Sequence, residues 1–133
     1  MTRFAIDAAT ALRIVREDPP LPDGIQLVGP TVLRSDVLAA LYRDVRAGVL
    51  VPAEGRHLRD RLAELKVRLL GDRVSRARAW QIAADRNWDE IGPAEYLAVA
   101  VLQADVLVTE DAFLRAAAEG LIPVVGFDDL LAG

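Results

Sequence analysis

Two aspartates follow short apolar runs that we expect to be buried strands. Asp7 comes directly after residues 4–6 (Phe-Ala-Ile), and Asp111 comes shortly after residues 106–108 (Val-Leu-Val). Ligands of open parallel α/β sheets bind at the carboxyl ends of the strands, so both side chains are expected at that edge. A carboxylate placed there is costly unless it caps a helix or binds a cation. Taken singly, each aspartate is more readily explained as the cap of the helix that follows it.

Asp36 is harder to explain as a cap. It lies inside a predicted helix over residues 31–47, past the first turn and beside the apolar stripe. Aspartate is a poor residue inside a helix, and neither Arg34 nor Arg43 stands three or four positions away as an ion-pair partner. Converging carboxylates raise one another's pKa, and Mg²⁺ or Mn²⁺ relieves that repulsion. Such an ion can activate water for attack on a phosphodiester, which is the chemistry of a nuclease.

The other residue types favour no competing kind of catalysis. The chain has no cysteine, and its one histidine, His57, lies in an arginine-rich stretch that we interpret as surface. Serine–histidine and cysteine–histidine arrangements are therefore disfavoured. A phosphatase with an aspartate nucleophile usually needs a second aspartate at the position that Ala9 occupies. A receiver-like signalling domain needs a lysine after a late strand, and no lysine stands there in this chain. The two tryptophans, Trp80 and Trp88, are interpreted as core or core-edge residues rather than base-stacking platforms.

Strands and helices alternate along the chain, which predicts one α/β domain over residues 1–133 with a parallel sheet covered on both faces. Pro123 marks the last strand as an edge strand. The helix over residues 54–69 carries a leucine stripe at helical spacing. The expected strands cover residues 3–7, 25–28, 106–108 and 122–125, and the expected helices cover residues 8–15, 31–47, 54–69, 74–87, 94–103, 112–119 and 127–131.

Charge is distributed unevenly along the sequence. The formal net charge is −4, yet eight of the 16 basic residues lie between Arg56 and Arg78. This stretch is either a basic face that meets a polyanion or a solvated helical face paired with Asp60, Glu64 and Asp72. No apolar run approaches the roughly 20 residues that span a bilayer, and residues 1–12 show no clean signal segment. We therefore expect a cytoplasmic protein without a membrane span.

Four segments resemble, in order, the motifs of the PIN-domain family, and in particular of the VapC-type toxin ribonucleases. Residues 4–8 resemble the opening strand-plus-aspartate motif, and residues 34–38 the second acidic motif, where glutamate is usual. Residues 94–100 resemble the third motif, and residues 107–111 the fourth, with its threonine and aspartate. The resemblance covers nearly the whole chain. It implies a three-layer α/β/α sandwich with a short central parallel sheet, an endoribonuclease dependent on Mg²⁺ or Mn²⁺, an RNA substrate, a homodimer and inhibition by a VapB-like antitoxin.

The resemblance also implies roles for individual residues. Asp7, Asp36 and Asp111 would hold the metal ion, and Thr109 would assist by hydrogen bonding to Asp7 or to the substrate. Asp36 is one methylene shorter than the usual glutamate, which favours binding through water.

The third motif departs from the family pattern. It normally begins with an aspartate two residues before Glu95, and Pro93 stands there instead. Asp89, Glu90 and Glu95 are nearby acids, and Glu95 is the preferred substitute because it lies in the first turn of a predicted helix. The departure leaves two hypotheses: a working ribonuclease toxin, or a PIN-like domain with weakened catalysis that serves as a binding or regulatory module.

Overall fold

The computed structural model describes residues 1–133 and is built on a sheet of five parallel strands in the order β3-β2-β1-β4-β5. In the central strand β1, Phe4 pairs with Leu27 of β2 on one side and with Val106 of β4 on the other. The short β5 lies at one edge of the sheet, which confirms the prediction from Pro123 that the last strand is an edge strand. The strands are β1 (Thr2–Ile6), β2 (Ile25–Pro30), β3 (Arg68–Leu70), β4 (Val106–Val108) and β5 (Val124–Val125).

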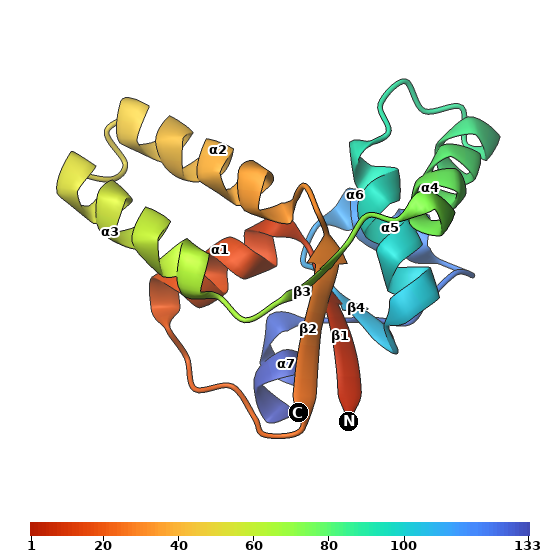
Figure 1. The fold of residues 1–133 in the computed structure, drawn as a ribbon, viewed down its shortest axis with the longest axis horizontal. Helices are drawn as coiled ribbons and strands as arrows, with labels where there is room; N and C mark the ends of the chain where they lie inside the picture. The colour runs from red at the N-terminus through yellow and green to blue at the C-terminus, as the bar shows by residue number, and fades with distance from the viewer.

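Seven helices cover both faces of this sheet (Figure 1). Because side chains alternate along a strand, Phe4 and Ile6 of β1 enter a core formed with α1, α2, α3 and α7, while Ala5 enters a second core formed with α4, α5 and α6. The predicted three-layer α/β/α sandwich is therefore confirmed. The helices are α1 (Ala8–Glu17), α2 (Leu33–Arg46), α3 (Pro52–Glu64), α4 (Arg73–Asp85), α5 (Gly92–Gln103), α6 (Ala112–Ala118) and α7 (Phe127–Ala132).

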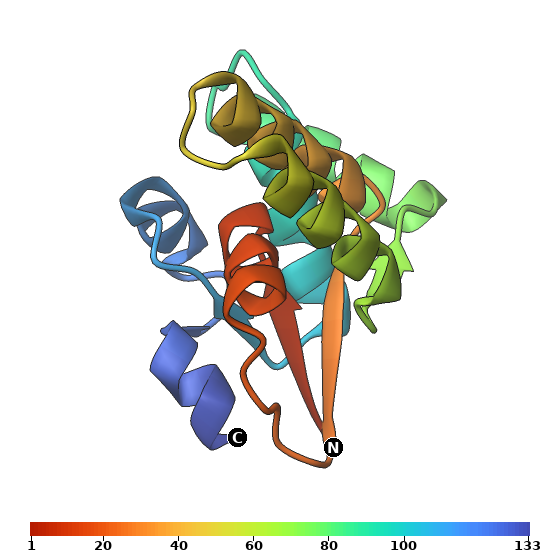
Figure 2. The same ribbon diagram turned by 90° about the vertical axis from the view of Figure 1, so that its left-hand side faces the viewer.

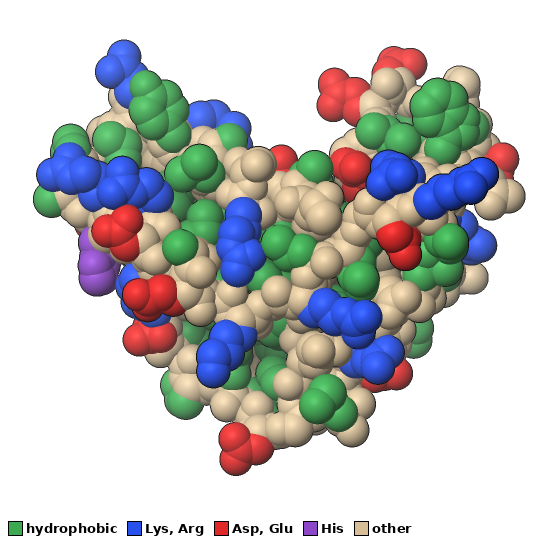
Figure 3. All heavy atoms as spheres, viewed as in Figure 1, with side chains coloured by type: hydrophobic (Ala, Val, Ile, Leu, Met, Phe, Trp, Pro, Cys, Tyr) green, Lys and Arg blue, Asp and Glu red, His purple; other side chains and the backbone are tan.

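The molecule is notched at the end where the strands finish. Figure 3 shows two lobes separated by a hollow, with α2 and α3 in one lobe and α4 with the start of α5 in the other. Both chain termini lie at the opposite end of the sheet (Figures 1 and 2). The hollow is thus the place where residues that follow β1 and β4 can meet residues from the two lobes.

The main error in the predicted elements is the helix over residues 54–69. The helix α3 ends at Glu64, and the chain then turns to form β3, in which Leu69 pairs with Gly29 of β2. Of the leucines in the predicted stripe, only Leu58 and Leu62 lie in α3, and both are buried in the core. No glycine or proline marks the end of α3, so pairing with the open edge of β2 overrides the local helical pattern.

The tryptophans behave differently from each other. Trp88 is half-buried and packs against Phe113, with ring centroids 5.1 Å apart, as expected for a core-edge residue. Trp80 is 73% exposed, so the prediction that it lies in or beside the core is wrong. Its position on the outer face of α4 gives it no buried surface to contact. His57 is exposed, as predicted.

The arginine-rich stretch is only partly neutralised. Arg59 pairs with Asp60, and Arg61 pairs with Asp18. The other basic residues between positions 56 and 78 form no ion pair. Of the three predicted acidic partners, only Asp60 forms an ion pair within the stretch, and Glu64 and Asp72 form none.

None of the helices combines the length and the apolar character that crossing a bilayer requires.

Candidate functional site

The three predicted aspartates line one pocket. Asp7, Asp36 and Asp111 face a space of about 350 Å³ at the carboxyl ends of β1 and β4, together with Pro93 and Tyr96 of α5. Asp7 and Asp111 reach it from strand ends, and Asp36 reaches it from the start of α2. The fold therefore brings the three aspartates to one pocket, as the sequence predicted.

Asp7 is the most firmly held of the acids. It is only 5% exposed and is the N-cap of α1, where one carboxylate oxygen accepts a 2.8 Å hydrogen bond from the backbone N–H of Thr10. The other oxygen accepts a 2.6 Å hydrogen bond from the hydroxyl of Thr109. Each oxygen still has a second lone pair. The carboxylate is therefore fixed in orientation and can still accept a further donor or a cation.

Thr109 connects the two acids that follow strands. Its hydroxyl is fully buried, donates to Asp7 and accepts a 3.0 Å hydrogen bond from the backbone N–H of Asp111. Asp111 in turn caps α6 by accepting a 2.8 Å hydrogen bond from the N–H of Leu114 on Oδ2. No hydrogen bond reaches its Oδ1. Both aspartates are therefore caps, as the simplest interpretation expected, and both also line the pocket.

Asp36 is held from across the pocket. The hydroxyl of Tyr96 on α5 donates a 2.7 Å hydrogen bond to Oδ2 of Asp36. Because α2 begins at Leu33, Asp36 lies in the first turn of the helix, and the prediction that it lies beyond that turn is wrong. A carboxylate in the first turn is favourable beside the positive end of the helix dipole.

The environment of Tyr96 is strongly negative. Burial of the ring, the hydrogen bond to Asp36 and the charges of Asp36, Asp7 and Glu95 all raise the pKa of the Tyr96 hydroxyl far above its usual range. The hydroxyl therefore keeps its proton and remains a hydrogen-bond donor. The carboxylates of Asp36, Asp7 and Glu95, whose charges add to the effect of burial, would also favour a cation near this hydroxyl.

The position of the family's additional acid is filled by Pro93. It lines the pocket from the first turn of α5, with Gly92 before it and Tyr96 one turn later on the same face. Glu95 does not line this pocket and instead lines an adjoining one with Arg76. Asp89 and Glu90 are exposed in the loop before α5 and do not line the pocket either. The hypothesis that Glu95 replaces the missing aspartate gains no support from this arrangement.

The donor set suits a hard cation by its chemistry. Asp36 and Asp111 each keep one oxygen without a hydrogen bond, and Asp7 keeps lone pairs on both. No group of three or more acidic, histidine or cysteine side chains is arranged closely enough to hold a metal ion as a ready-made cage. Mg²⁺ rarely needs such a cage, because it binds through one or two carboxylates and retains several waters. The residues therefore fit Mg²⁺ or Mn²⁺ with partial hydration.

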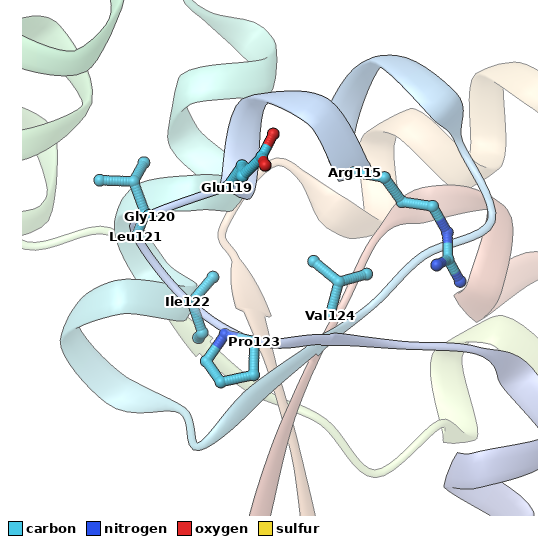
Figure 4. Close-up of a pocket in the computed structure, with 7 residues that line it drawn as sticks. All are labelled: Arg115, Glu119, Gly120, Leu121, Ile122, Pro123 and Val124. Carbon is cyan, nitrogen blue, oxygen red and sulfur yellow. The ribbon is translucent and has the colours of Figure 1, made fainter.

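The larger pockets do not carry this chemistry. A pocket of about 540 Å³ lies between α6 and β5, where Arg115 and Glu119 stand above the segment that leads into β5 (Figure 4). Another, of about 550 Å³, lies at the opposite end of the sheet beside Met1. Neither contains more than one acid, so neither offers an alternative carboxylate site.

The sequence interpretation missed Tyr96 and Thr10. Tyr96 is the hydrogen-bond partner that Asp36 was expected to need, although it lies 60 positions away. Its spacing of three residues from Pro93 places both on one face of α5, which is the signal that could have found it. Thr10 holds β4 as well as Asp7, because its hydroxyl donates to the carbonyl of Val108 at 3.2 Å.

No protein-family model matches the sequence, and no curated protein does either. Several solved structures share its fold. PAE2754 from Pyrobaculum aerophilum superposes with a TM-score of 0.70 at 22% identity, over 98% of this chain and 93% of that one. VapBC2 from Rickettsia felis, bound to a DNA fragment from its promoter, gives a TM-score of 0.64 at 5% identity over 94% and 98% of the two chains. VapBC-1 from nontypeable Haemophilus influenzae gives 0.63 at 11% identity over 96% and 99%.

These likenesses extend over nearly the whole of each chain at low sequence identity, so they concern the fold. The five-stranded parallel sheet flanked by seven helices matches the PIN-like architecture of the VapBC structures. The chain therefore has a PIN-like α/β/α fold.

Proposed function

We propose that the chain is an endoribonuclease dependent on Mg²⁺ or Mn²⁺ that acts as the toxin of a VapBC-type toxin–antitoxin pair. The observation that carries the proposal is the convergence of Asp7, Asp36 and Asp111 on one pocket at the strand ends. The likeness to VapBC structures supports it at the level of the fold. A divalent cation held by such a carboxylate cluster would supply the activated water that hydrolysis of an RNA phosphodiester needs.

The position of each side chain in the pocket suggests its role in the proposed reaction. Asp7 would be the central ligand, because Thr10 and Thr109 fix both of its oxygens. Asp36 and Asp111 would each contribute the oxygen that forms no hydrogen bond. When bound, Mg²⁺ supplies an activated water and neutralises charge that develops on the phosphodiester. Thr109 acts as a positioning residue, since its hydroxyl touches Asp7 and Asp111 rather than the open pocket.

The proposed antitoxin has a fitting surface on the lobe formed by α2 and α3. A groove of about 260 Å³ lies between these helices, lined by Leu38, Leu41 and Tyr42 on the α2 side and by Arg56 and Arg59 on the α3 side. Such a groove suits the apolar face of a helix with acidic flanks. A small antitoxin-like protein encoded in the adjacent reading frame would support this part of the proposal, and sedimentation would test the proposed homodimer.

RNA cleavage tests the activity directly. Wild-type protein and the Asp7→Asn variant are incubated with single-stranded RNA and Mg²⁺ or Mn²⁺, and with EDTA as the metal-free control. Asp128→Asn is the matched control, because Asp128 is an exposed acid on α7, at the far end of the sheet. We expect cleavage by wild type and Asp128→Asn and none by Asp7→Asn. Equal activity in all three proteins would overturn the mechanism.

A PIN-like domain with weakened catalysis, acting as a binding or regulatory module, is the second candidate. The observation that favours it is Pro93, which places an apolar ring where the family has a carboxylate. Calorimetry separates the two: this candidate predicts no Mn²⁺ binding at millimolar concentration, whereas the ribonuclease proposal predicts binding that Asp7→Asn abolishes.

A further inference from the structure

An exposed tryptophan lies among arginines on the outer face of α4. Trp80 is 73% exposed, and Arg73 and Arg76 precede it by seven and four positions, so the three side chains form one stripe along the helix. The stripe covers about 10 Å along the helix axis. Figure 3 shows a large hydrophobic side chain and several basic ones gathered over α4, on the lobe beside the notch.

The groups of this stripe are free to bind. Neither Arg73 nor Arg76 forms an ion pair, and the side chain of Arg76 donates a hydrogen bond only to the backbone carbonyl of Gly71. The two cation–π contacts of the protein cover Phe127 and Trp88, so no guanidinium stacks on Trp80. The indole, which is 73% exposed, is therefore accessible to a flat partner.

The stripe adjoins the acidic pocket. Arg76 lines a small pocket of about 150 Å³ with Thr31, Ser75 and Glu95 at the carboxyl ends of β2 and β3. Glu95 belongs to the first turn of α5, the same turn that presents Pro93 to the acidic pocket. The first turn of α5 therefore borders both the pocket that Arg76 lines and the pocket that the aspartates line.

We propose that the stripe Arg73–Arg76–Trp80 binds single-stranded RNA beside the scissile bond, with a base stacked on Trp80 and phosphates on the arginines. The inference deepens the proposed function and rests on it for the identity of the substrate. Unpaired arginines beside an uncovered aromatic ring are the combination that proteins use to follow a single strand, whereas a protein partner would seek a contiguous apolar patch. The residues that flank Trp80 one turn away, Ala77 and Ala84, are small and leave room for a base.

Binding is measured separately from cleavage. Fluorescence anisotropy of a short labelled single-stranded RNA is followed with the Asp7→Asn protein as the background. Adding Trp80→Ala should weaken binding about tenfold, the effect of losing one stacked base. Val49→Ala, a residue 63% exposed in the loop between α2 and α3, should leave the affinity unchanged. Arg73→Gln should reduce the slope of log affinity against log salt by about 0.7, the value for one phosphate contact with a single strand.

Tryptophan fluorescence gives an independent signal. RNA should quench the emission of the Asp7→Asn protein, and the quenching should disappear in Asp7→Asn/Trp80→Phe, which keeps Trp88 and a ring that can still stack. Affinity retained in that variant, with the quenching lost, supports direct stacking on position 80.

The outcomes distinguish this proposal from the proposed function. Binding that depends on Trp80, in a protein whose wild type cleaves no RNA, supports the surface and overturns the nuclease. Cleavage by wild type with unchanged RNA affinity in Trp80→Ala overturns the surface and leaves the nuclease standing. A dimer that dissociates on Trp80→Ala, with no change in RNA affinity, identifies a protein contact and also overturns the RNA proposal.

Discussion

The hydroxyl of Tyr96 donates a 2.7 Å hydrogen bond to the carboxylate of Asp36 and thereby ties α5 to α2 across the acidic pocket. The two residues belong to the two lobes on either side of the notch. Because burial and the surrounding acids raise the pKa of the Tyr96 hydroxyl, the donor keeps its proton at neutral pH. The bond engages Oδ2 of Asp36 and leaves Oδ1 without a hydrogen bond.

Tyr96→Phe should lower activity through metal binding rather than through the fold. The change removes one hydroxyl and keeps the buried ring, so it should cost about 0.5–1.5 kcal/mol of unfolding free energy. Asp36 then rotates freely, and the Mn²⁺ concentration needed for half-maximal cleavage should rise. Cleavage rates measured across a Mn²⁺ titration check this, with Tyr42→Phe, which removes an exposed hydroxyl, as the control. An unchanged metal requirement would show that the bond is only structural.

Thr109→Val should disturb both aspartates that follow strands. The substitution keeps the shape of the side chain but removes the hydroxyl that donates to Asp7 and accepts from the N–H of Asp111. The partly buried N–H of Asp111 is left without its acceptor and the buried Asp7 carboxylate loses a donor, so unfolding free energy should fall by about 1–3 kcal/mol. Urea unfolding measures the loss. Thr109→Ser keeps the hydroxyl and should recover most of the stability, and a Ser variant as unstable as Val would contradict the role of that group.

Asp72, the N-cap of α4, should make the stability of the fold depend on pH in the acidic range. Hydrogen bonds from the backbone and side chain of Ser75, together with the charge of Arg76, hold the pKa of Asp72 below its ordinary value of 3.8. A carboxyl whose pKa is lower in the folded state contributes stability above its unfolded value, and the contribution is lost as pH falls through the folded value. Asp72→Ala should therefore lower Tm at pH 7, and the difference from wild type should narrow below about pH 4. A constant difference across this range would contradict the assignment.

The position of Asp7 and Asp111 could be predicted because it depends on local order in the chain. An aspartate after a buried parallel strand must lie at the carboxyl edge of the sheet, and the strands at residues 4–6 and 106–108 are evident from their apolar runs. The partner of Asp36 could not be predicted in the same way. Tyr96 reaches it only because two helices far apart in sequence flank one pocket.

The errors come from residues for which local pattern and tertiary contact disagree. Leu69 continues the spacing of an amphipathic helix, yet it lies in β3, where it pairs with the edge of β2. Trp80 has a large hydrophobic side chain like many core residues, yet Ala79, Ile82 and Ala83 already fill the inward face of α4. Hydrophobicity alone does not say which face of a helix a residue occupies.

Pro93→Asp should strengthen the metal site. Pro93 lines the acidic pocket from the first turn of α5, where a carboxylate is favoured by the helix dipole and where the ring of proline makes no side-chain hydrogen bond that could be lost. A fourth carboxylate would face Asp7, Asp36 and Asp111, so affinity for Mn²⁺ and the rate of RNA cleavage should both rise. Isothermal titration and cleavage assays measure the two effects.

The matched control is Pro93→Asn, which keeps the size and the backbone change of the aspartate without its charge. Because the gain depends on the negative charge, Asn should leave Mn²⁺ affinity close to that of wild type. If Asp raises metal affinity but cleavage stays absent, the chain has lost catalysis for a reason other than Pro93, and the regulatory-module candidate is favoured. If Asp and Asn behave alike, the first turn of α5 does not face the bound ion, and the ligand set is confined to the three aspartates.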